Sequence, residues 1–183
     1  MELKLTIPAN SLDRVIPPSE ELAQAAADDV RKLVKQHLRN RNMSSAPAGG
    51  MPKSNYYGDA ADATGIEKEG KQISVVISKE GAALHYYGGT VYPGPGKKAL
   101  AIPKHPQTAG KRAAEFSGAM FVVWGKGKTS GMLVSCEPST AGELMYLLLP
   151  KATIPADPTV LPSTEQMMDA ANAAITRYLE LMS

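Results

Sequence analysis

Two long segments, one near each end of the chain, repeat apolar residues at the spacing of an amphipathic helix. In the first, residues 19–41, charged and polar positions separate the apolar ones. Ser19 is a suitable N-cap, and two acidic residues follow it where they favour the positive end of the helix dipole. This pattern predicts a helix of about twenty residues with one face against a core. Its apolar stripe is Leu22, Ala26, Val30, Leu33, Val34 and Leu38.

The second segment, residues 163–182, begins with Ser163 and Gln166 at the spacing of a capping box. Pro162 stands directly before it, so the preceding extended region is expected to end there. The chain is therefore predicted to finish in a helix. The stripe expected to be buried is Met168, Ala171, Ile175, Tyr178 and Met182.

Between the helices, apolar residues alternate with polar ones or form short runs, which is typical of strands. The run at 120–124 is predicted to be a central strand with 132–136 as its hairpin partner, and 73–77 a strand with one buried face. Short helical or turn elements are expected at 59–63 and 84–87. The predicted strands are 3–7, 73–77, 90–92, 99–102, 120–124, 132–136, 144–149 and 151–154.

This order of elements predicts an α+β fold in which a mostly antiparallel β-sheet is packed by an N-terminal and a C-terminal α-helix, with long loops. A chain of 183 residues, 43% of them hydrophobic, can bury a core without disulfides or metals. We expect one domain over residues 1–183, in which the Pro-, Gly- and Ser-rich stretches 42–58 and 103–119 are flexible loops.

Charge and cysteine content narrow the function only slightly. The net charge of +2 does not by itself indicate nucleic acid as a partner. A single cysteine, Cys136, excludes an internal disulfide framework and is predicted to be packed and inert. We find no secretion signal pattern and no run long enough to cross a membrane, so a reducing, cytoplasmic setting is expected.

Motifs for nucleotide, metal or catalytic chemistry are weak. The segment 125–130 contains Gly-Lys-Thr, but Val122 stands where a phosphate-binding loop needs glycine, and a strand follows; a turn is predicted. His85 and His105 lack a metal-ligand partner at a suitable offset, and His37 is expected on a helix surface. We therefore expect no catalytic residue, metal or cofactor. A small hydrolase built on His85 would need Ser74, Ser78 or Cys136 nearby.

Basic residues gather in one stretch of the chain, between residues 97 and 112, with no acidic residue among them. Such a stretch can be a solvated loop, a contact with a partner subunit, or a contact with phosphate backbone. Lys126 and Lys128 follow in the predicted turn. The five candidates for an interface are Lys97, Lys98, Lys104, Lys111 and Arg112.

Two separated blocks carry a family resemblance. The first is His85-Tyr86-Tyr87-Gly88-Gly89 followed by a short strand and Leu100-Ala101-Ile102-Pro103; the second is the apolar run 144–149 followed by 151–158 and its prolines. In this order they resemble the phage Mu G-like virion morphogenesis (tail completion) proteins. The resemblance covers about residues 73–162 and also fits the two flanking helices.

The resemblance implies a structural protein of a tailed phage or prophage, not an enzyme, which completes the tail or joins it to the head. Its expected partners are further copies of itself in a ring and proteins of the tail tube or neck, with DNA passing through the lumen and no membrane. Its location would be the virion, and the host cytoplasm during assembly. Tyr86, Tyr87 and Tyr92 join the basic residues as candidate interface residues, because tyrosine is favoured at interfaces.

An alternative of a different class is a nucleic-acid-binding accessory protein that uses the same basic residues. Its affinity for duplex DNA would fall steeply with salt, whereas an assembly protein would bind duplex weakly at physiological salt.

Overall fold

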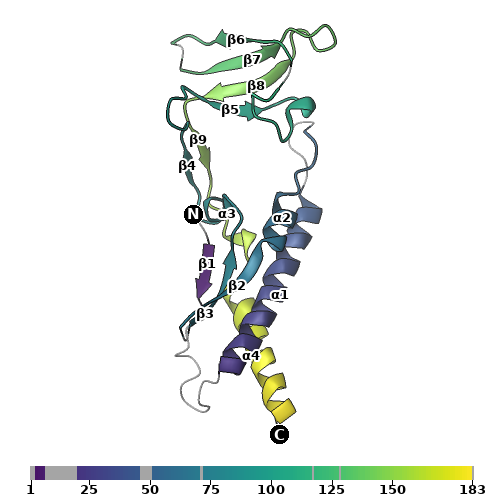
Figure 1. Cartoon of the computed structure of the whole chain (residues 1–183), viewed down its shortest axis with the longest axis vertical. Coiled ribbons are helices and arrows are strands. Elements are labelled where there is room, and N and C mark those ends of the chain that lie inside the picture. The colour runs from purple at the N-terminus through teal and green to yellow at the C-terminus, as the bar shows by residue number, and fades with distance from the viewer. Residues whose placement is uncertain are drawn as a thin grey trace. The chain divides into compact units, whose positions relative to one another are not determined.

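The computed structural model describes residues 3–6 as backbone and residues 20–45, 51–70, 72–116, 118–127 and 129–182 in full. The protein is α+β, with its N-terminal and C-terminal helices packing on antiparallel sheet, as the sequence predicted (Figure 1). The helices are α1 (Glu20–Ser44), α2 (Tyr56–Asp62), α3 (Ala82–Tyr87) and α4 (Thr164–Met182), with short 3-10 helices η2 (Pro106–Thr108) and η3 (Pro158–Val160). The strands are β1 (Leu3–Thr6), β2 (Thr64–Glu69), β3 (Gln72–Ile77), β4 (Gly89–Val91), β5 (Leu100–Pro103), β6 (Met120–Trp124), β7 (Gly131–Ser135), β8 (Leu144–Leu149) and β9 (Ala152–Ile154).

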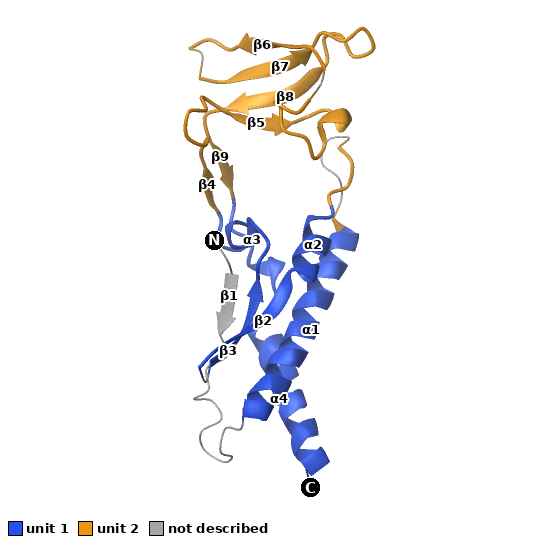
Figure 2. Cartoon of the chain, in the orientation of Figure 1, with its two compact units in different colours: residues 1–44, 55–88, 155–183 blue, residues 45–54, 89–154 orange. Residues whose placement is uncertain are grey.

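The chain separates into two compact units, shown in different colours in Figure 2. Unit 1 comprises residues 1–44, 55–88 and 155–183, and unit 2 comprises residues 45–54 and 89–154. The prediction that residues 1–183 form one domain stays a prediction.

Unit 1 contains the main hydrophobic core and both long helices. Its sheet has the order β1-β3-β2, and α1 packs on α4, β2 and β3. The expectation of one buried face for 73–77 is wrong, because all five residues from Ile73 to Ile77 are buried. As the middle strand, β3 pairs with a neighbour on either side: Val75 lies opposite Leu5 and Ile66. Strand β2 was not predicted, because its charged residues interrupt the alternation of apolar and polar residues that indicates a strand.

The two helices confirm most of the predicted stripes. In α1, five of the six predicted residues are buried and Leu33 is half-buried. In α4 the buried residues are Ala171, Ala174 and Ile175, whereas Met168 and Met182 are exposed, so their predicted burial is wrong. Because α4 is rich in small residues, either of two neighbouring stripes of its surface is suited to face the core. The stripe that faces it is flanked by Met167 and Leu179, which pack partly against the core.

Local contacts at the start of α4 explain why the helix begins where it does. Gln166 N–H donates to Ser163 Oγ at 3.2 Å, and Ser163 N–H donates to Gln166 Oε1 at 3.0 Å. This reciprocal pair is the predicted capping box, and it satisfies backbone donors that the first helical turn cannot. Arg177 of α4 forms an ion pair with Asp29 of α1, which links the two helices.

Unit 2 contains a sheet of order β5-β8-β7-β6 and the separate pair β4–β9. The predicted hairpin of 120–124 with 132–136 is confirmed by pairing of Met120 with Ser135 and of Trp124 with Gly131. The prediction that 120–124 is a central strand is wrong: β6 lies at the edge of its sheet. An apolar run signals burial only when another element covers it, and the sequence gives no sign of that element.

The two predicted flexible loops are partly ordered. Helix α1 continues to Ser44 and α2 begins at Tyr56, so both ends of the stretch 42–58 are helical; residues 46–50 lie outside the described residues. In the stretch 103–119, the fully buried Thr108 lies in η2 and Lys104 N–H donates to Met145 O at 2.9 Å. Part of this second stretch is therefore packed against β8, whereas a flexible loop was predicted over its whole length.

Candidate interaction surface

Strand β6 exposes large apolar side chains on both sides of the sheet. Phe121 is 48% exposed, Val122 45%, Val123 38% and Trp124 39%. Because successive side chains of a strand point to opposite faces, Phe121 and Val123 share one face while Val122 and Trp124 share the other. The strand contains no charged residue and no proline.

The exposed apolar area continues across neighbouring strands. Val123 lies opposite Met132 of β7, and Phe121 lies opposite Val134, which in turn pairs with Leu144 of β8. Directly opposite residues share a face of the sheet, and a register shift between Leu133 and Val134 brings Leu144 opposite Val134. We call the exposed set Phe121, Val123, Met132 and Leu144 the apolar face of unit 2. Exposed apolar side chains that gather on one face, instead of occurring singly, are typical of interaction sites.

The backbone of β6 presents unpaired groups along the outer edge of the sheet. Gly125 N–H donates to Ser130 O at 2.9 Å and Cys136 N–H donates to Ala119 O at 2.8 Å. Hydrogen-bonded pairs alternate along an antiparallel ladder, so Phe121 and Val123 direct their backbone groups toward β7. The N–H and C=O groups of Met120, Val122 and Trp124 therefore point away from the sheet. Within the described residues, no hydrogen bond uses these outward groups.

The side chain of Trp124 fixes the end of β6 by covering a glycine. A Cβ atom built on Gly131, its cross-strand neighbour, would lie 2.9 Å from Cε3 of the indole and 2.8 Å from the Val123 carbonyl oxygen. Gly131 is buried even though it has no side chain, because the indole lies over it. A larger residue at 131 would displace the ring.

The opposite edge of the same sheet is built differently. In β5, Lys104 N–H bonds to β8, so by alternation Ala101 and Pro103 face outward. Pro103 has no N–H to offer to another strand. Exposed lysines stand on both sides of β5, at residues 98 and 104. Proline and lysine are the devices by which proteins block unwanted strand pairing, so the β5 edge is protected and the β6 edge is open.

The predicted tyrosines occupy different positions. Tyr86 and Tyr87 lie on α3 in unit 1, with ring centroids 4.8 Å apart in an edge-to-face arrangement. Tyr86 packs against the unit 1 core, whereas Tyr87 is 59% exposed. Tyr92 follows β4 in unit 2 and is 65% exposed. Tyr87 and Tyr92 are thus available to a partner, and Tyr86 is partly used in packing.

The five predicted basic residues all lie exposed on unit 2. Lys111 Nζ lies 5.6 Å from the centroid of the Phe116 ring, and Arg112 pairs with Glu115 at 3.5 Å. In the described part of the chain, no carboxylate lies within ion-pair distance of Lys97, Lys98, Lys104 or Lys111. Lys128 of the neighbouring turn lies outside the described residues.

His85 has a structural environment in unit 1. Its ring contacts Tyr56 and Tyr57, with centroids at 4.7 and 6.0 Å, and its backbone O accepts from Asp157 N–H at 3.1 Å. Burial lowers the pKa of His85, the Arg41 cation lowers it further, and Asp157 opposes the change. Burial among these aromatic side chains thus favours the neutral form of the ring.

The segment before α4 is hydrogen-bonded to α1 close to His85. Arg41 donates to Thr159 O at 3.1 Å and to Thr159 Oγ1 at 2.9 Å, and it forms an ion pair with Asp157. Thr159 Oγ1 also donates to Asp157 at 2.5 Å, and this hydrogen bond together with Arg41 lowers the Asp157 pKa. His37 was expected on a helix surface; its Nε2 lies 2.9 Å from Thr159 O, so it also contacts this segment.

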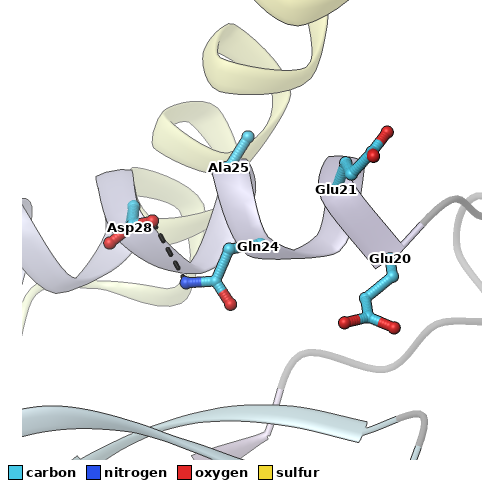
Figure 3. Close-up of a pocket in the computed structure, with 5 residues that line it drawn as sticks. All are labelled: Glu20, Glu21, Gln24, Ala25 and Asp28. Atoms are coloured by element: carbon cyan, nitrogen blue, oxygen red, sulfur yellow. Dashed lines mark hydrogen bonds between the residues drawn. The ribbon is translucent and has the colours of Figure 1, made fainter.

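Cys136 and a depression on α1 give little support for catalysis or ligand binding. Cys136 is exposed, which corrects the prediction of a packed thiol: it follows the last residue of β7. A depression on α1 is lined by side chains of that helix alone, and within it Gln24 donates to Asp28 at 3.1 Å (Figure 3). Among the described residues, no cluster of histidine, cysteine and carboxylate side chains could hold a metal ion, and no helix could span a membrane.

Comparison with known proteins adds no relative: no family model, curated protein or solved structure matches the chain. The open β6 edge and the apolar face of unit 2 are therefore the structural features that bear on function. The apolar run at 120–124 is visible in the sequence, but its exposure is known only from the structure.

Proposed function

We propose that this chain is a phage structural protein that acts in tail completion or head–tail joining through ring-forming protein–protein contacts. The apolar face of unit 2 carries the proposal, because a surface of this kind is suited to bind protein and not a small molecule. The resemblance of residues 73–162 to the Mu G-like tail completion proteins supplies the biological setting. The neighbours in the particle would be further copies of the chain and proteins of the tail tube or neck.

The candidate interface residues have different roles in this proposal. The apolar face supplies the area that is removed from water when a neighbour binds. Tyr87 and Tyr92 can add amphipathic contacts. The basic residues 97–112 can face an acidic neighbour or the DNA that passes through the lumen, since most of them have no carboxylate partner among the described residues.

The proposal is tested by measuring the mass of the purified protein over a concentration series by light scattering, with negative-stain imaging of any large species. We expect rings at high concentration, and we expect Phe121→Ser combined with Met132→Ser to abolish them. Met168→Ser is the matched control, because it removes an exposed methionine from α4 in unit 1. Rings that persist in the double variant would contradict the role of the apolar face.

The basic residues need a separate test in the phage itself. Reversal of charge at Lys97, Lys98, Lys104, Lys111 and Arg112 is expected to reduce assembly and infectivity. Unchanged assembly and infectivity would remove these residues from the proposal.

The nucleic-acid alternative is supported by one observation, the exposed lysines without a carboxylate partner. If it holds, the wild-type protein binds duplex DNA with a strong inverse dependence on salt, and the charge-reversed variant does not bind. Negligible duplex binding at physiological salt would favour the assembly role.

A further inference from the structure

The open edge of β6 has the geometry needed to pair with itself. We infer that a second copy of this chain pairs its β6 antiparallel to β6 across a two-fold axis at Val122, so that two four-stranded sheets become one continuous sheet. This inference goes beyond the proposed function and does not rest on it. The two-fold contact joins the backbone edges of two β6 strands, whereas the head-to-tail contact of a ring is assigned to the apolar face, which the strand pairing extends.

The outward backbone groups of two β6 strands are complementary in this arrangement. In this register Val122 lies opposite Val122 of the second copy, and Met120 lies opposite Trp124. These are the residues whose N–H and C=O groups point outward, and the hydrogen-bonded pairs of an antiparallel ladder require outward groups on both strands. Centring the two-fold axis on Val122 is the choice that overlaps the full length of both β6 strands and pairs every outward group.

The side chains agree with this register. Opposite residues lie on the same face, so Phe121 of one copy lies beside Val123 of the other, and the apolar faces of both copies join. Side chains that each copy leaves about half exposed would lose water contact on both faces of the sheet. No charge in β6 is buried by the pairing.

Charge complementarity distinguishes a second copy from an unrelated strand. The carboxylate of Glu137 lies against Gly118, because a Cβ built there would lie 2.6 Å from Glu137 Oε1. The same register places Lys126 of the second copy opposite Gly118 and therefore next to Glu137. The two-fold axis repeats this contact at the other end of the strand. In the described part of a single copy, neither Lys126 nor Glu137 forms an ion pair.

The protected β5 edge restricts strand pairing between copies to the β6 edge. Pro103 and the flanking lysines leave β5 poorly able to accept another strand, so β6 of one copy cannot add to β5 of the next without losing hydrogen bonds. Of the two edges of this sheet, β6 can pair with itself at full length.

The first test is a proline variant designed to spare the fold. Val122→Pro removes an outward N–H and no bond to β7, and proline favours an extended residue before it. Sedimentation equilibrium is expected to show a wild-type dimer and a monomeric V122P over the same concentrations. Ala101→Pro is the matched control, because it removes an outward N–H from the β5 edge and should leave the dimer intact. Circular dichroism checks that both variants fold.

The second test uses charge and does not depend on proline. Lys126→Glu and Glu137→Lys are each expected to weaken dimerisation about tenfold through loss of two symmetric ion pairs and new repulsion. The double variant K126E/E137K should restore the wild-type dissociation constant, since the charges are exchanged across the axis. Failure of the double variant to recover would overturn the register.

The two proposals fail separately. A wild-type protein that stays monomeric, or a dimer that V122P leaves intact, overturns the inference; in the first case the open edge is assigned to a strand of a different protein. A dimer that V122P and K126E disrupt, in a protein that never forms rings, keeps the inference and counts against the proposed function.

Discussion

The two units of this protein use apolar residues in opposite ways. Unit 1 buries them: Val34, Leu38 and Val75 are fully inaccessible to water in a core built by two long helices and a sheet. In unit 2, by contrast, all five residues of β6 are apolar, yet the strand lies at the edge of its sheet and four of its side chains are exposed. The contrast separates apolar residues that stabilise a fold from apolar residues that the fold leaves exposed to water.

The largest effect is expected in the central strand of unit 1. Val75→Ser leaves a cavity and places a hydroxyl among apolar side chains, so the free energy of unfolding should fall by about 3 kcal/mol. Denaturant unfolding followed by circular dichroism measures it. A loss below about 1 kcal/mol would mean that β3 is not the centre of the core.

The next effect concerns the helix cap of unit 1. Ser163→Ala removes the oxygen that accepts from Gln166 N–H and should cost about 1 kcal/mol. Ser139→Ala changes an exposed serine of unit 2 and should cost less than about 0.5 kcal/mol. Equal losses in the two variants would show that the capping box contributes nothing.

A pH effect should also belong to unit 1. The folded protein lowers the His85 pKa, whereas the unfolded chain takes up a proton near the ordinary value of about 6.5. The unfolded state then binds more protons below that pH, so stability is present above it and falls as the pH decreases from 7 to 5. His85→Gln should flatten this slope in urea unfolding curves. An unchanged slope in the variant would assign the dependence to other groups.

The smallest effect on folding sharpens the comparison, because it repeats the first substitution at the edge of unit 2. Val122→Ser should change the free energy of unfolding by about 0.5 kcal/mol or less when measured at low protein concentration, since the side chain is already 45% exposed. At high concentration the same variant should associate more weakly than the wild type. A folding loss as large as that of V75S would show that β6 belongs to a core.

The sequence predicted those features that depend on neighbouring residues. The capping box and the helix it begins follow from residues three apart, and the β6–β7 hairpin follows from two apolar runs around a glycine-rich turn. Strand β2 could not be predicted, because Glu67, Lys68 and Glu69 interrupt the alternation and its pairing with β3 supplies the order. The exposure of β6 depends on the absence of a covering element, and no local pattern records that.

The same distinction applies to the candidate interaction residues. Tyr87 and Tyr92 were identified by residue type, and both are exposed. Tyr86 was chosen on the same grounds, but its position on α3 directs it toward the core of unit 1, against which it packs. Glu137 could not be selected in advance, because its closeness to Gly118 arises from the path of the chain after β7.

The position of Trp124 has a spectroscopic consequence. It is the only tryptophan in the chain, and it lies at the open edge with its indole over Gly131 and 39% of the residue exposed. Intrinsic fluorescence excited at the indole band therefore reports on one strand and not on the whole molecule. Any partner that covers this edge should shift the emission to shorter wavelength and reduce quenching by iodide, so the chain carries its own probe for assembly without a label.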